Sequence, residues 1–103
     1  MEIVNDLFQQ LHSRFQITQY DYSRNWLKKG RGYFAHLQSS KTKPKADVLL
    51  AILGEAMKQK AVWESSAKHT DGASRTYHQQ QADYFGEIQR SAEEAIRKQA
   101  LSI

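Results

Sequence analysis

The chain has 103 residues, with 15 lysines and arginines, 11 aspartates and glutamates, four histidines and no cysteine. This length suits one domain with an appended arm, and the lack of cysteine excludes a disulfide scaffold, a thiolate zinc site and a cysteine nucleophile. The longest apolar run, residues 48–53, is too short to span a membrane, and residues 1–6 lack the basic region of a secretory signal, so we expect a cytoplasmic protein.

The first part of the chain predicts two helices. Over residues 2–14 apolar side chains recur at three- and four-residue spacing, which predicts an amphipathic helix. Thr18 followed by Asp21 resembles a capping box, with Asp in place of Glu, and predicts that a second helix begins there. Because glycine accepts the left-handed conformation that closes a helix, we expect this second helix to end near Gly30.

Three further helices are expected after a turn at residues 30–32. The first of them is short and faces inward with Phe34 and Leu37, and a polar loop follows it. Pro44 fits the entry to the next helix, predicted over residues 45–60. After a break, the last helix runs to about residue 101 with only a thin apolar stripe.

No segment shows the alternation typical of a β-strand, so we expect an all-α fold. It comprises a domain of four to five helices over residues 1–66 and a C-terminal helix over residues 74–103 that packs on the domain or on a second copy. We favour a homodimer, because two-fold proteins read paired half-sites on DNA. The residues expected at the dimer interface are Tyr77, Tyr84, Phe85 and Ile88.

Basic side chains are concentrated in residues 22–46, which hold seven lysines and arginines and no acidic residue. Within residues 18–38, a capped helix, a glycine-containing turn and a second short helix make the arrangement of a helix-turn-helix unit. Basic and hydrogen-bonding groups on the outer side of the second helix are what entry into the DNA major groove requires. The pattern favours a nucleic-acid partner, although a solvated basic face has the same composition.

Three segments resemble the DNA-binding domains of the lambda-repressor/Cro family. Residues 18–26 are similar to the start of that family's helix-turn-helix, residues 31–38 to its recognition helix, and residues 43–52 to its proline-containing loop and fourth helix. The resemblance covers residues 3–60. It departs from the family at Leu27-Lys28-Lys29-Gly30, where Leu-Gly-Val-Ser is usual, so the turn is expected to be one residue longer.

The resemblance implies a function and a set of DNA contacts. It implies a transcriptional regulator that binds double-stranded DNA sequence-specifically, in particular a repressor of a bacterial, phage or plasmid gene. When bound to DNA, such a protein is associated with the nucleoid. The residues expected to face the bases are Arg31, Gly32, His36 and Gln38. The resemblance places Gln19 at phosphate, and charge and position add Arg24, Lys28, Lys29, Ser39, Lys41 and Lys43.

Two other partners stay open at this point. The same fold can serve as a protein-interaction module for an acidic partner, as an anti-activator or antitoxin-like component does. Aromatic residues interleaved with basic ones can also bind single-stranded nucleic acid, but their helical spacing favours core packing and leaves only Tyr20 outward. No catalytic motif, metal-ligand spacing or phosphate loop is present, so we expect no enzymatic activity, catalytic residue, metal or cofactor.

Overall fold

The structure is a computed structural model that describes residues 2–40 and 43–102. Its elements are α1 (Glu2–Phe15), α2 (Gln19–Asp21), the π-helical turn η1 (Tyr22–Trp26), α3 (Tyr33–Ser40), α4 (Ala46–Lys68) and α5 (Gly72–Leu101). The described residues contain no strand, so the predicted all-α class is confirmed. Among these helices, none is both long enough and apolar enough to cross a membrane.

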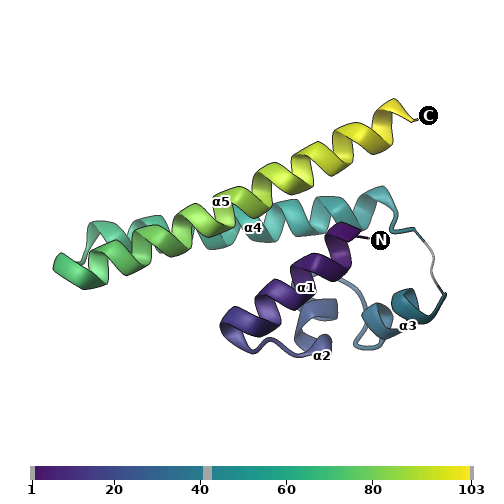
Figure 1. Cartoon of the computed structure of the whole chain (residues 1–103), viewed down its shortest axis with the longest axis horizontal. Coiled ribbons are helices and arrows are strands. Elements are labelled where there is room, and N and C mark those ends of the chain that lie inside the picture. The colour runs from purple at the N-terminus through teal and green to yellow at the C-terminus, as the bar shows by residue number, and fades with distance from the viewer. Residues whose placement is uncertain (1, 41–42, 103) are drawn as a thin grey trace.

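The helices form two groups (Figure 1). Helices α4 and α5 run antiparallel as a long hairpin, while α1, α2, η1 and α3 gather on one side of the N-terminal half of α4. The tip of the hairpin extends beyond this cluster, and the molecule measures 46 × 30 × 17 Å. The core lies where the two groups meet; its largest fully buried apolar side chains are Val4, Leu11, Tyr22, Leu27, Phe34, Pro44, Val48 and Ile52.

Helix α1 and the start of α2 follow the predictions closely. Helix α1 ends at Phe15 because Gln16 adopts a left-handed backbone, with φ of 59°. The Gln16 N–H still donates to the carbonyl of His12 at 2.8 Å. The predicted cap is confirmed, since the Thr18 hydroxyl accepts the Asp21 N–H at 3.1 Å.

The second helix differs from the prediction after its first turn. It widens into η1, in which the Leu27 N–H reaches the Tyr22 carbonyl five residues back, at 3.1 Å. It then stops at Trp26 instead of continuing to Gly30. Lys28 supplies the left-handed residue, with φ of 56°, and Gly30 has no positive φ. The expected glycine closure was therefore wrong, and a lysine takes that place.

The buried side of η1 connects three other elements. The Tyr22 hydroxyl donates to the Val4 carbonyl in α1 at 2.6 Å. The Ser23 hydroxyl accepts the Phe34 N–H at the start of α3 at 3.0 Å. The ring of Trp26 stacks on Phe85 of α5, with the ring centroids 6.0 Å apart. One short turn thus fixes α1, α3 and α5 relative to one another.

Both hairpin helices are longer than predicted. Helix α4 continues past residue 60 to Lys68, and α5 begins at Gly72, whose φ of 63° makes the turn between them. The amide of Gln99 donates to the Pro44 carbonyl at 3.1 Å, so the last turns of α5 lie beside the start of α4. The boundary expected between residues 66 and 74 is the hairpin turn, and α4 and α5 pack against each other along their length.

Two of the residues expected at a dimer interface lie inside the chain's own core. Phe85 and Ile88 are only 3% and 7% exposed. The Phe85 ring stacks on that of Phe15, 5.7 Å away. Of the other two, Tyr84 is partly buried and Tyr77 is 49% exposed.

The first test concerns Tyr22 at high pH. Burial raises the pKa of its hydroxyl well above the ordinary value of about 10. The unfolded chain therefore loses this proton near pH 10 while the folded chain keeps it, so the stability from Tyr22 is complete below pH 10 and falls above it. Urea unfolding at pH 7, 10 and 11 should show Tyr22→Phe less stable by about 1 kcal/mol at pH 7. Its loss of stability above pH 10 should be smaller than that of the wild type. If both proteins lost the same amount of stability above pH 10, the buried Tyr22 hydroxyl would not be the source of the loss.

Candidate nucleic-acid interface

Helix α3 lies at the edge of the molecule, on the side away from α5 (Figure 1). It is anchored by Phe34 and Leu37, which are buried, and by the Ser23 hydroxyl at its first turn. Its remaining side chains are partly or fully exposed, and none of them is acidic. A peripheral helix held only along one side leaves its other side open to a large partner.

The four residues expected to face DNA bases are all exposed. Arg31 and Gly32 lie in the turn before α3, and His36 and Gln38 lie on the helix itself. The Arg31 guanidinium lies over the ring of Tyr20, 5.4 Å from its centroid, and Tyr20 is 58% exposed. The stacking holds Arg31 at the N-terminal end of α3 without using its hydrogen-bond donors.

Two residues expected to contact phosphate, Lys28 and Lys29, form ion pairs within the chain. The Lys28 ammonium lies 3.0 Å from a carboxylate oxygen of Glu55, which is only 7% exposed, and it also donates to the Asn25 carbonyl. The Lys29 ammonium lies 2.6 Å from the carboxylate of Asp47. Both lysines tie the end of η1 to α4, so each already has a carboxylate partner within the chain.

The Lys29–Asp47 hydrogen bond favours the charged form of both groups. It holds the pKa of the Asp47 carboxyl below its ordinary value and raises the pKa of Lys29. Both groups are thus charged at neutral pH. Because both are solvent-exposed, the pair fixes the turn after η1 more than it stabilises the fold.

The other expected phosphate contacts fall into three groups. Gln19 and Arg24 are exposed on the α2–η1 side, and Lys43 is exposed before α4. Ser39 is exposed, but its hydroxyl donates to the His36 carbonyl at 3.1 Å. Lys41 lies outside the described residues.

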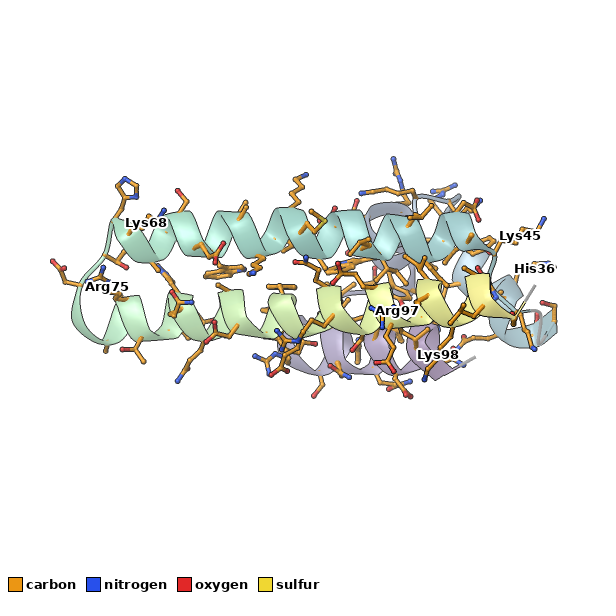
Figure 2. All side chains as sticks on the ribbon, turned by 90° about the horizontal axis from the view of Figure 1, so that it is seen from above. His36, Lys45, Lys68, Arg75, Arg97 and Lys98 are labelled. Atoms are coloured by element: carbon orange, nitrogen blue, oxygen red, sulfur yellow. The ribbon has the colours of Figure 1, made fainter. Side chains whose placement is uncertain are left out.

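Lys45 is a basic residue that the sequence reasoning left out of the site. It is exposed, and its side chain makes no capping hydrogen bond to α4. Figure 2 shows it at the same end of the molecule as His36, whereas Lys68 and Arg75 lie at the opposite end of the hairpin. The sequence could have indicated this residue, because Lys45 belongs to the basic segment of residues 22–46 that contains no acidic residue.

The connection between η1 and α3 is longer than in the helix-turn-helix units that the sequence resembles. Residues 27–32 separate the two helices, where a turn of three to four residues is usual. The Tyr33 N–H donates to the Gly30 carbonyl at 3.1 Å, and the His36 N–H donates to the Gly32 carbonyl at 3.0 Å. These bonds start α3 within the connection and set its direction.

A groove between α1 and α5 is acidic, in contrast to the basic surroundings of α3. It is an open depression of about 440 Å³ with an apolar floor that includes Leu7 and Ile88. Carboxylates line it from both helices: Asp6, Glu87 and Glu94. The only lysine that lines it, Lys98, lies 3.3 Å from Glu94. Three carboxylates against one lysine make this groove an unfavourable place for phosphate.

The role assigned to Lys28 can be tested by substitution. Lys28→Ala should lower the free energy of unfolding by about 1–2 kcal/mol, because it leaves the buried Glu55 carboxylate with only the Gln59 amide as a partner. Thermal and urea unfolding measure this effect. Lys58→Ala, which removes an exposed lysine from α4, the helix that carries Glu55, is the control and should change stability by less than about 0.5 kcal/mol. Equal effects of the two substitutions would show that the ion pair is not structural.

The comparisons with known proteins identify a family. The model of a family of unknown function, DUF6626, matches residues 4–102, so the chain belongs to that family. The match spans the α1–α3 cluster and the hairpin together. Neither the curated proteins nor the solved structures include one that matches the chain significantly.

Proposed function

We propose that this protein binds double-stranded DNA and enters the major groove with α3. The observation that carries the proposal is the exposed side of α3, which has no acidic residue and is flanked by basic side chains that make no ion pair within the described residues. These basic residues are Arg24, Arg31, Lys43 and Lys45. The major groove admits a helix with this kind of surface, and the neighbouring phosphates attract its basic rim.

Each part of the interface has a distinct role in this proposal. Arg31 presents planar donors that suit the O6 and N7 acceptors of guanine. His36, in the first turn of α3, and Gln38, in the second turn, reach base edges further along. Arg24 on one side and Lys43 with Lys45 on the other contact phosphates and set the register of α3 on the duplex. A protein bound in this way acts by occupying a promoter, which makes repression the regulatory outcome we propose.

The contact between Tyr20 and Arg31 supports a second candidate. An exposed tyrosine beside an arginine is typical of the residues that dominate protein–protein interfaces, and an acidic protein surface would satisfy the same basic rim. The salt dependence separates the two partners. DNA binding weakens steeply with salt as counterions return to the phosphates. The logarithm of the binding constant falls with the logarithm of the salt concentration, with a slope of about −0.9 for each phosphate contact.

The experiment is a fluorescence-anisotropy titration of a random-sequence 20-base-pair duplex at two salt concentrations. Arg31→Ala/Lys45→Ala should weaken binding at low salt by about tenfold or more and should reduce the salt slope by about one to two. Both side chains are exposed, so the variant keeps its fold.

The matched control is Lys68→Ala/Arg75→Ala, which removes the same charge at the far end of the hairpin (Figure 2). It should retain most of the affinity. Equal losses in the two variants would mean that net charge alone attracts DNA. Absence of duplex binding by the folded wild type at low salt would contradict the proposal and favour the acidic protein partner.

A further inference from the structure

One side of α4 exposes large apolar residues where the hairpin has no covering element. Leu50 is 54% exposed and Met57 is 51% exposed, seven residues apart on the same side of the helix. The core-facing residues of α4, such as Ile52 and Ala56, lie on the opposite side and are fully buried. Packing within the chain therefore does not account for Leu50 and Met57.

Small residues alternate with these large ones. Gly54 and Ala61 are exposed on the same side, also seven residues apart, and no heavy atom lies within 4 Å of the position that a Cβ on Gly54 would take. The order along the helix is large, small, large, small over about 16 Å. We call these four residues, Leu50, Gly54, Met57 and Ala61, the α4 stripe.

The α4 stripe is complementary to itself when two copies run antiparallel. If Leu50 faces Ala61 of a second copy, then Gly54 faces Met57 of that copy, and the reverse pairs follow by symmetry. Both pairs are centred on the same point, the peptide bond between residues 55 and 56, so one two-fold axis satisfies every layer. Large residues opposite small ones are what close helix packing requires.

The helix dipoles favour the same orientation. Antiparallel pairing brings the first turn of α4 in one copy near the last turn of α4 in the other, where the opposite ends of the helix dipoles attract. A parallel pair would place like dipole ends together.

We propose that a second copy of this chain covers the α4 stripe, in an antiparallel α4–α4 dimer. The dimer does not rest on DNA binding, because every contact that defines it lies on α4. It replaces the interface expected on α5, where Phe85 and Ile88 are already buried. The stripe is short, so the dimer is a weak, reversible one.

Sedimentation of the full chain without DNA tests the dimer. The wild type should sediment as a dimer at high concentration, and Leu50→Lys/Met57→Lys should raise the dissociation constant at least about tenfold. Ala61→Leu should also weaken the dimer, because it places a large side chain opposite Leu50 of the second copy. Leu50→Ala/Ala61→Leu should restore it, because the large residue moves to the facing position. A monomeric wild type at several hundred micromolar, or an Ala61→Leu variant that dimerises as well as the wild type, would overturn the proposal.

Single cysteines test the register, since the chain has none of its own. Met57→Cys places a thiol close to the two-fold axis and should give a disulfide-linked dimer as the main oxidised species. Tyr77→Cys on α5 is the control, with a nearly equal exposure of 49% at a residue outside the stripe. Preferential cross-linking of Tyr77→Cys would contradict the α4 interface and favour one on α5. Circular dichroism of each variant confirms that it is folded before either measurement.

Discussion

The structure depends on the buried side of η1. Tyr22 and Ser23 are fully buried, and each satisfies its hydroxyl with a backbone group of another helix. Burial of an unpaired hydroxyl or N–H costs free energy, so these two bonds fix where α1 and α3 lie relative to η1. Trp26, one turn later, adds the stack on Phe85 that brings α5 onto the same turn.

The widened turn also explains how the basic segment is divided. Because η1 ends at Trp26 and the backbone reverses at Lys28, the two lysines that follow point to α4 and pair with Glu55 and Asp47. Arg31, beyond the reversal, lies beside α3 and Tyr20 instead. The continuous basic run is therefore divided, with Lys28 and Lys29 paired to α4 and Arg31 left without an ion pair within the described residues.

Local patterns in the sequence predicted the elements but not the contacts between them. The Thr18 cap, the apolar face of α1 and the all-α class depend on neighbouring residues, and the structure confirms them. The π-turn and the left-handed Lys28 have no local signal that could separate them from an ordinary helix closed by Gly30. The partners of Lys28 and Lys29 lie 27 and 18 residues away, so only the tertiary fold shows that these charges are already paired. The same holds for Phe85, whose burial depends on Phe15 and Trp26.

The acidic groove and the α3 surface give the two sides of the molecule opposite electrostatic characters. The groove between α1 and α5 is lined by Asp6, Glu87 and Glu94, whereas α3 and the turn before it contain no acidic residue. The α4 stripe belongs to neither surface, because it is made of uncharged residues on the hairpin. A dimer through the stripe would leave the side chains proposed to contact DNA unused by the interface, so the two proposals are compatible and independent.

The most direct test of the central claim is an NMR titration of the isotopically labelled chain with a short DNA duplex. The backbone amide shifts should change in residues 19–40 and 43–45, with Arg31 and His36 among the most affected. Changes should be small at the hairpin tip around residues 68–75 and in the acidic groove. Changes centred on the tip or the groove, or no changes with duplex DNA at low salt, would contradict the claim that α3 is the surface that meets DNA.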